Sequence, residues 1–469
     1  MLLFFATRAG AYTIPYEMWM GTFIGDKKVG WTSVNIEDAE YEGAKGYKVT
    51  TVVNNHLTVL GADMTQFVLT TVYTDLKYAP LAEDFSMSSG GSTTTVKSKF
   101  GKKSVECEIS AGSGASTKSI PIPDGVELIA DPLYTTSDVF PEVGKEYNMH
   151  YFNPLTLSIE DLKIKVEKRE KLTIGGKEYD TVKIENINPM GNMMVWQEAD
   201  GAIVQVKGIM DITMTRMSRK DATADTEGAG DLAVLTCALS DKPIANPRAV
   251  KYLDALLVGI SEPGMLITDA RQKASVPKSE TRPNCASFKI TATKFNAAKS
   301  AERPVTAPGL GDYLEATPPY IDSDEKSVSD AASQIVGSEK NAYRACAKIR
   351  AWVYRNMVVK ADIGITRAGS DVLKSKKGVC RDYAILFASL ARSAKIPSKV
   401  VSGLIYTDGA FYYHAWVECY VGKWVPFDAT LSTDFVDATH IKLVEGDATT
   451  MFSLARVIGT LKVEVKEVR

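Results

Sequence analysis

Residues 378–403 read GVCRDYAILFASLARSAKIPSKVVSG, and residues 412–430 read YYHAWVECYVGKWVPFDAT. In chain order the two stretches carry Cys380, His414 and Asp428. A thiol nucleophile needs three groups: the sulfur itself, a base that takes its proton, and a carboxylate that orients the base. We therefore predict that Cys380, His414 and Asp428 form one catalytic site.

Cys380 stands where a helix is expected to begin. Gly378 precedes it and favours a tight turn, and the apolar residues from 384 to 391 fill much of a helical circumference. This pattern predicts a buried helix that ends before Pro397. A thiol at the N-terminus of a helix lies at the positive end of the macrodipole, which stabilises the thiolate. Asp382 falls in the first turn, where its carboxylate can cap exposed N–H groups.

His414 and Asp428 fall on the strands that follow. Residues 399–430 predict three strands in close succession, and His414 lies on the second of them. Side chains alternate along a strand, so Cys419 faces away from His414 and is predicted to be a core residue. Asp428 follows a proline at the end of the third strand. A carboxylate there can accept the imidazole N–H of His414 and fix the tautomer of the ring.

These motifs resemble a known family. GVCRDYA, then IPSKVVSG, HAWVE and WVPFDAT resemble the transglutaminase-like superfamily in its bacterial form, over about residues 313–445. The resemblance implies a papain-like fold with Cys380 as nucleophile, His414 as base and Asp428 as the orienting carboxylate. It also implies an oxyanion hole, in which the backbone N–H of Cys380 is one donor and the second donor is left open.

The expected chemistry is cysteine-dependent acyl transfer or hydrolysis on protein or peptide amide carbonyls, through a thioester. An amine acceptor makes such an enzyme a transglutaminase, whereas water makes it a protease or amidase, and the sequence does not separate these. The alternative is a catalytically weak or inactive binding or scaffold protein of the cell envelope. No cofactor or metal is expected, because the six cysteines include no CxxC pair and there are only four histidines.

The chain of 469 residues is too long for one ordinary core, so we expect a multidomain protein. Residues 12–220 are predicted to form a β-rich N-terminal domain, an antiparallel half-barrel or sandwich. The support is recurrent alternation together with hairpin signals at Gly175-Gly176 and Asp200-Gly201. Residues 218–232 are polar and small, which is typical of a linker.

Two further segments complete the predicted organisation. Residues 233–300 contain strand patterns and either extend the first domain or form a small domain of their own. Residues 313–469 are predicted to be the α+β catalytic domain. Its first clear helix covers residues 339–358, with Ser338 as the expected N-cap.

Charge and hydropathy limit the partners. The net charge of -2 gives no electrostatic case for binding nucleic acid. No apolar run reaches the ~20 residues that a membrane-spanning helix needs, so no integral membrane segment is expected. Residues 1–11, MLLFFATRAGA, are interpreted as the remnant of a signal peptide, with a buried first strand as the alternative. We therefore expect an exported protein, periplasmic or extracellular, that acts on a protein or peptide substrate; its oligomeric state is left open.

Overall fold

The chain divides into two compact units, Met1–Asp231 and Leu232–Arg469. The proposed signal-peptide remnant at residues 1–11 lies outside the residues that the structure describes. The structure, a computed structural model, describes residues 14–111, 114–130, 142–189, 191–199, 201–226, 228, 230–260, 262–278, 280–360 and 366–469.

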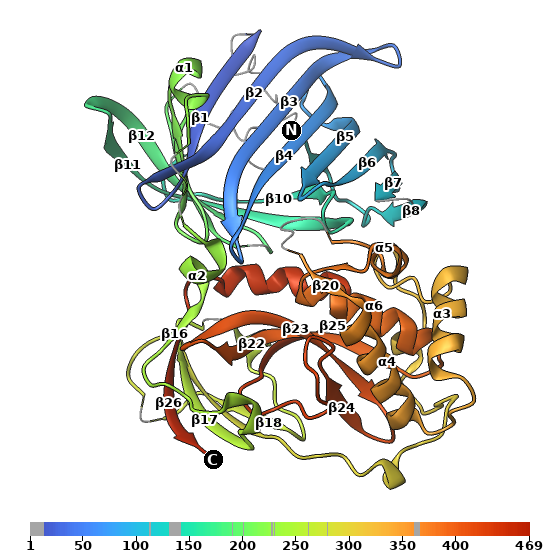
Figure 1. Cartoon of the computed structure of the whole chain (residues 1–469). Helices are drawn as coiled ribbons and strands as arrows, with labels where there is room; N and C mark the ends of the chain where they lie inside the picture. Colours follow the sequence, from blue (N-terminus) through green and yellow to red (C-terminus); the bar gives the residue numbers. More distant parts are fainter. Residues whose placement is uncertain are drawn as a thin grey trace. The chain divides into compact units, whose positions relative to one another are not determined.

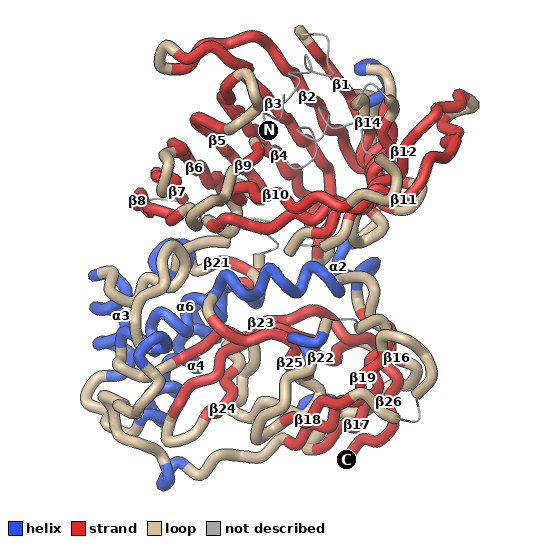
Figure 2. Tube along the Cα trace, turned by 180° about the vertical axis from the view of Figure 1, so that it is seen from behind, coloured by secondary structure: helices blue, strands red, loops and turns tan. Residues whose placement is uncertain are grey.

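Within its described residues, the N-terminal unit is built on one curled sheet of fifteen strands (Figures 1 and 2). Its strands are β1 (Tyr16–Ile24), β2 (Lys27–Tyr41), β3 (Ala44–Val59), β4 (Ala62–Asp75), β5 (Pro80–Ser89), β6 (Ser92–Phe100), β7 (Ser104–Ala111), β8 (Gly114–Pro121), β9 (Leu128–Ile129), β10 (Glu146–Asn153), β11 (Ser158–Ile174), β12 (Lys177–Ile187), β13 (Met193–Gln197), β14 (Ile203–Lys207) and β15 (Ile212–Arg216). The strand order is β8-β7-β6-β5-β4-β3-β2-β1-β15-β14-β13-β12-β11-β10-β9. Neighbouring strands are antiparallel except β9 and β10. The predicted antiparallel all-β region is therefore confirmed, as one curved sheet instead of the two packed sheets of a sandwich.

Alternating side chains explain how this sheet makes a core. In β1 and β2 alternate residues are buried, among them Met18, Met20, Val34 and Ile36, while most side chains between them are more exposed. The predicted hairpin at Gly175-Gly176 joins β11 to β12, and both glycines have positive φ angles, 57° and 80°. Strands β13 and β14 also pair as a hairpin at Gly201, although Asp200 itself lies outside the described residues. The core of this unit consists of Met18, Met20, Val34, Ile36, Val49, Tyr78, Tyr151, Leu162, Ile164, Val166, Val182, Ile184, Val195, Ile203 and Val206.

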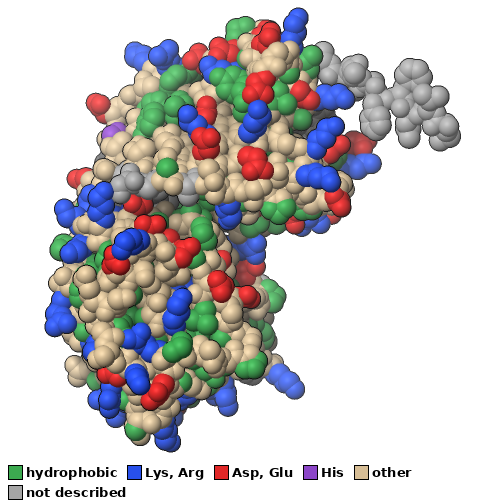
Figure 3. Space-filling view, turned by 90° about the vertical axis from the view of Figure 1, so that its right-hand side faces the viewer, with side chains coloured by type: hydrophobic (Ala, Val, Ile, Leu, Met, Phe, Trp, Pro, Cys, Tyr) green, Lys and Arg blue, Asp and Glu red, His purple; other side chains and the backbone are tan. Residues whose placement is uncertain are grey.

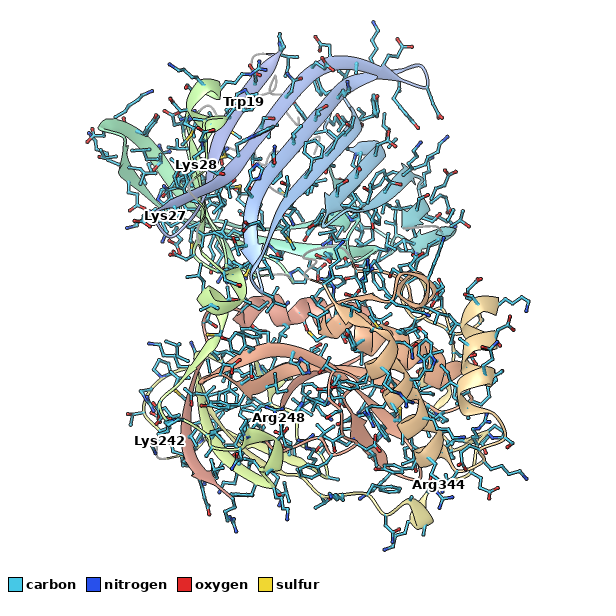
Figure 4. The ribbon with its side chains drawn as sticks, in the orientation of Figure 1. Trp19, Lys27, Lys28, Lys242, Arg248 and Arg344 are labelled. Atoms are coloured by element: carbon cyan, nitrogen blue, oxygen red, sulfur yellow. The ribbon has the colours of Figure 1, made fainter. Side chains whose placement is uncertain are left out.

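The segment predicted as a linker begins with one short helix, α1 (Arg219–Ala222). Ser218 caps it by accepting the Asp221 N–H at 3.1 Å. Lys28 of β2 donates to the Ala224 carbonyl at 2.9 Å, and the Arg219 guanidinium lies 5.1 Å from the Trp19 ring centroid (Figure 4). The first part of this segment therefore packs on the N-terminal sheet.

The C-terminal unit combines helices with a nine-stranded sheet. Its elements are α2 (Leu232–Thr236), β16 (Ala238–Ser240), η2 (Pro247–Ala249), β17 (Tyr252–Val258), η3 (Pro263–Met265), β18 (Gln272–Ser275), β19 (Cys285–Thr291), η4 (Ala297–Lys299), η5 (Gly311–Tyr313), α3 (Lys326–Val336), α4 (Ala342–Asn356), β20 (Val358–Val359), α5 (Gly369–Ser375), β21 (Lys377–Gly378), α6 (Cys380–Ser393), β22 (Ser398–Thr407), β23 (Ala410–Tyr420), β24 (Trp424–Phe427), β25 (Ile441–Gly446), η6 (Ala448–Val457) and β26 (Lys462–Val468). The sheet order is β18-β19-β17-β26-β16-β23-β22-β25, and β24 pairs with β23.

Two cores flank the β22–β23 part of this sheet. Helices α3, α4 and α6 gather on one side (Figure 1), where Ala415, Val417 and Cys419 of β23 are buried among them. Cys419 is therefore a core residue, as predicted. The second core joins β22 to β17 and β19, with Leu404 and Phe288 among its members.

Residues 233–300 do not extend the first sheet. Their strand β17 pairs with β26 near the C-terminus, and β16 pairs with β23. The alternative in which this segment belongs to the first domain is therefore wrong. Strand pairing across a long sequence separation assigns the segment to the C-terminal unit, and no local pattern reports such pairing.

The helix expected from residue 339 begins three residues later than predicted. Its N-cap is Asn341, whose side-chain oxygen accepts the Arg344 N–H at 3.0 Å. Ser338 lies between two helices, because α3 ends at Gly337 with a φ of 58°. Ser and Asn are equally good caps, so the sequence alone did not rank the two positions.

Within the described ranges, no helix has both the length and the apolar character that crossing a bilayer requires. Basic and acidic side chains are interspersed on the face that Figure 3 shows. This distribution fits the net charge close to zero.

Candidate active site

Cys380 is the first residue of α6, as predicted, and it is partly exposed. The start of the helix is fixed by Asp382, whose Oδ2 accepts the Val379 N–H at 2.8 Å and whose Oδ1 lies 3.2 Å from Arg367 Nη2. A Cβ at Gly378 would lie 2.5 Å from Asp382 Oδ2 and 2.7 Å from Arg367 Nη2. Close packing against Asp382 and Arg367 therefore explains the glycine at position 378. From the sequence alone, this glycine had been attributed to a tight turn.

His414 lies on β23, and Asp428 directly follows β24. Because β24 folds back antiparallel to β23, Asp428 returns toward His414. His414 Nε2 lies 2.7 Å from Asp428 Oδ2, and an ionised carboxylate can only accept, so the imidazole donates. Asp428 Oδ1 accepts the backbone N–H of Thr430 at 2.8 Å and its hydroxyl at 2.7 Å. The carboxylate is 1% exposed and fixed at both oxygens.

The Cys380 thiol lies close enough to the His414 side chain and to the backbone of Ala415 for both to act on its charge. His414 Nε2 is engaged by Asp428, so Nδ1 is the nitrogen left to face the sulfur. Burial raises the pKa of the Cys380 thiol, but the hydrogen bond and charge of His414 outweigh burial and bring this pKa below its ordinary value of 9.0. The structure therefore brings together all three residues that the sequence singled out.

The base and the carboxylate shift each other in the expected directions. Burial lowers the pKa of His414, but the charge and hydrogen bond of Asp428 outweigh burial and raise this pKa to about 10. Burial raises the pKa of Asp428, yet the charge and hydrogen bond of His414, with a hydrogen bond from His440, hold it well below its usual range. The lowered pKa of Cys380 and the raised pKa of His414 both favour a thiolate–imidazolium pair over two neutral groups.

Two residues that the sequence interpretation did not assign to the site, Trp416 and His440, also lie there. The Trp416 ring stacks near the His414 ring at 6.2 Å between centroids and meets the His440 ring edge-on at 5.3 Å. His440 Nε2 lies 3.2 Å from Asp428 Oδ2, the oxygen that His414 also contacts. Strand alternation already placed Trp416 on the face of His414. No local signal pointed to His440, which lies just before β25.

The three residues His414, Asp428 and His440 also offer nitrogen and oxygen atoms that lie within 4.8 Å of one another, as a metal site requires. However, Asp428 Oδ2 already receives both imidazole nitrogens, at 2.7 and 3.2 Å. A cation would have to displace both of these hydrogen bonds. We therefore interpret the group as a hydrogen-bonded set.

A close approach of backbones positions the strand next to this set. Gly403 of β22 lies directly opposite His414 on β23, and the register of β22 with β25 shifts at Gly403. A Cβ at Gly403 would lie 1.9 Å from the Ile441 carbonyl oxygen. Only glycine therefore permits β25 to run this close, and β25 follows His440 directly.

Comparison with known proteins covers the part of the chain that holds this site. Residues 329–429 match the model of the transglutaminase-like superfamily, so the predicted resemblance is confirmed for this part of the chain. An uncharacterised protein from Mycobacterium leprae is 30% identical over 84 residues, which are 16% of this chain and 29% of that protein. The match therefore spans less than a third of the relative.

The solved structures that match this chain share little sequence with it. A candidate cysteine protease from Cytophaga hutchinsonii is 19% identical, with a TM-score of 0.33, and the match covers 47% of this chain and 86% of that one. The periplasmic domain of TgpA from Pseudomonas aeruginosa is 13% identical, with a TM-score of 0.31 and coverages of 43% and 93%. A β-barrel-like protein from Brucella abortus is 9% identical, with a TM-score of 0.33 and coverages of 43% and 93%.

Proposed function

We propose that this protein is a cysteine-dependent acyl transferase or hydrolase acting on amide carbonyls of proteins or peptides. Cys380 is the nucleophile, His414 the acid and base, and Asp428 the residue that orients His414. The single observation that carries the proposal is the hydrogen bond between His414 Nε2 and Asp428, which orients a histidine that acts on the Cys380 thiol.

The proposed reaction has two halves. The Cys380 thiolate attacks the carbonyl carbon, and a C–S bond forms while the carbonyl oxygen takes the negative charge. The His414 imidazolium gives its proton to the leaving amine, the C–N bond breaks, and a thioester remains on Cys380. In the second half an amine or water attacks the thioester, His414 takes the proton of the attacking group, and the thiolate leaves.

The first test needs no substrate, because it measures the thiol itself. Iodoacetamide alkylation of each cysteine is followed by peptide mass spectrometry as a function of pH. The rate at Cys380 is expected to inflect below pH 9.0, the ordinary thiol value, because His414 favours the thiolate. Cys107 is a matched internal control, since it is buried and burial raises its pKa. The proposal fails if Cys380 reacts no faster than Cys107 near neutral pH.

The second test identifies the acceptor. A glutaminyl peptide is incubated with the protein, with and without an added primary amine, and the masses of the products are measured by mass spectrometry. Amine incorporation defines a transglutaminase, and backbone cleavage defines a protease. Hydrolysis of the glutamine side-chain amide to glutamate, with release of ammonia, defines a deamidase. Cys380→Ala is the control and is expected to yield none of these products. A product formed at the same rate by Cys380→Ala would exclude the thioester route.

We further propose that the reaction takes place outside the cytoplasm. The support is the signal-like composition of residues 1–11. Fractionation of the source cell tests this proposal. Recovery of the protein in the cytosol with residues 1–11 intact would contradict it and leave the thiol chemistry unaffected.

A further inference from the structure

His440 is a buried histidine whose two ring nitrogens both face oxygen atoms that accept. Nε2 lies 3.2 Å from Asp428 Oδ2, while Nδ1 lies 3.2 Å from the Asp437 carbonyl oxygen and 3.5 Å from Asp437 Oδ1. The side chain is 0% exposed, so water does not compensate a missing proton. A neutral imidazole carries one N–H and would turn a lone pair toward one of these oxygens, whereas an imidazolium donates at both nitrogens.

With Cys380 as a thiolate and His414 as an imidazolium, the charges around His440 balance if His440 is also positive. Asp437 Oδ2 accepts from Arg248 Nη1 at 2.8 Å. Arg248, labelled in Figure 4, comes from η2 within residues 233–300, the middle segment of the chain. With the proposed thiolate–imidazolium pair in place, the group holds three anions and, if His440 is counted, three cations. The anions are the Cys380 thiolate, Asp428 and Asp437, and the cations are His414, Arg248 and His440.

The neighbouring charges are already paired among themselves. Lys442, two residues after His440, donates to Asp269, Glu418 and Glu445 at 2.6 to 2.8 Å. Lys399 lies 2.8 Å from Glu445 and 3.4 Å from Glu418. Arg271 completes this second set, since its guanidinium faces the charges of Glu418, Asp437 and Asp269 and its Nη2 donates to the Asp437 carbonyl. The second set again holds three anions and three cations, so it adds no net charge to the group around His440.

From this arrangement we propose that His440 is a positively charged positioning residue, an imidazolium held between Asp428 and Asp437. It acts on the Cys380–His414 pair through the carboxylate of Asp428 that both histidines share. The inference rests on the proposed function and deepens it, because it adds a fourth residue to the site and links the middle segment to it through Arg248.

A positive charge on His440 should lower the proton affinities of Cys380 and His414. The His414 and His440 rings lie 5.8 Å apart, a distance at which a buried cation strongly disfavours protons on its neighbours. Removing the charge of His440 therefore makes both Cys380 and His414 hold their protons more tightly. A neutral His440 with a purely structural role would leave these proton affinities unchanged when it is replaced by a neutral residue.

The experiment uses the full chain, with EDTA present, and two complementary variants. His440→Gln keeps an N–H donor near the position of Nε2, facing Asp428, and His440→Asn keeps one near Nδ1, facing Asp437. The readout is the pH inflection of Cys380 alkylation by iodoacetamide. Both variants are expected to move the inflection upward by about one pH unit, because each removes the charge. His150→Gln is the matched control, since His150 pairs with Asp161 in the N-terminal unit, and it should leave the inflection in place.

A second measurement stands even if both variants fail to fold. Side-chain ¹⁵N shifts of histidine distinguish an imidazolium from either neutral tautomer, and the chain has only four histidines to assign. His440 of the unaltered protein is expected to carry protons on both nitrogens at neutral pH. A single N–H on His440, or folded variants whose alkylation inflection does not move, would overturn the inference. Failure of the proposed function would give another result. In that case the alkylation of Cys380 in the unaltered protein would not inflect below pH 9.0, the ordinary thiol value.

Discussion

His414 and Asp428 come from adjacent strands and lie 2.7 Å apart at Nε2 and Oδ2, so the ring presents its other nitrogen to Cys380. The same carboxylate is anchored by Thr430 through its second oxygen. Orientation of the base is therefore set by the β23–β24 pairing, and the thiol is brought to it by the start of α6.

Replacing the orienting carboxylate should damage the site less than removing the base. Asp428→Asn removes the charge that raises the pKa of His414, so this pKa falls from about 10 toward its ordinary value of 6.5. Turnover is expected to drop by about 10²–10⁴-fold in Asp428→Asn, and further in His414→Ala, which also removes the proton carrier. Turnover of whichever amide substrate is identified checks the ranking. Equal activity in Asp428→Asn and the unaltered protein would argue against the orienting role.

The Cys380–His414 pair predicts a specific dependence of stability on pH. The folded pair holds one proton, on His414, between the lowered pKa of Cys380 and about 10, whereas the unfolded groups titrate near 6.5 and 9.0. Above both 6.5 and the lowered pKa of Cys380, and up to 9.0, both states hold one proton and stability is flat. Above 9.0 the unfolded chain loses its thiol proton while folded His414 keeps its own, so stability falls until His414 titrates near 10.

Cys380→Ala should remove that plateau. In the variant only His414 remains, and its pKa stays raised by Asp428, so stability falls as soon as pH exceeds 6.5. The difference in unfolding free energy between the two proteins, measured by urea titration, should therefore grow with pH across the plateau of the unaltered protein, up to 9.0. The other titrating groups contribute equally to the unfolding free energies of both proteins, so their contributions cancel in this difference. A difference that does not vary with pH in this window would mean that the folded protein holds no thiolate–imidazolium pair.

Gly403→Ala should be strongly destabilising. Its Cβ would meet the Ile441 carbonyl oxygen at 1.9 Å, so β22 and β25 would have to separate. We expect a loss of about 2–4 kcal/mol in unfolding free energy, measured by urea denaturation. Gly264→Ala is the control, because a Cβ there meets open space. If the two substitutions cost the same, the close approach at Gly403 is not needed.

Lys442→Met should unbalance the buried charges beside the site. Lys442 is 3% exposed, and burial lowers its pKa, but Glu418, Asp269 and Glu445 outweigh burial and raise this pKa above its usual range. Its loss leaves carboxylates without their shared partner, which is expected to cost about 3–5 kcal/mol in unfolding free energy. Lys326→Met is the matched control, because Lys326 forms an exposed pair with Asp330 worth less than about 1 kcal/mol. Comparable losses in the two variants would contradict the role of Lys442.

The sequence by itself determined the elements and the identity of the three central residues. The start of the helix at Cys380, the alternation that places His414 and Trp416 on one face of a strand, and the hairpin at Gly175-Gly176 are all local patterns. Each depends on spacing along a few residues of chain, and such spacing is visible in the sequence. The order of Cys380, His414 and Asp428 added the resemblance to a family.

Only the tertiary structure decided what joins those elements. The attachment of residues 233–300, the approach of Ile441 to Gly403, and the placement of His440 and Arg248 around the two aspartates all depend on pairing between distant segments. Long-range strand pairing and buried charge compensation carry no periodic signal, because each partner satisfies its local rules in many folds. His440 and Arg248 therefore look ordinary in the sequence and join the site only when the C-terminal sheet is assembled.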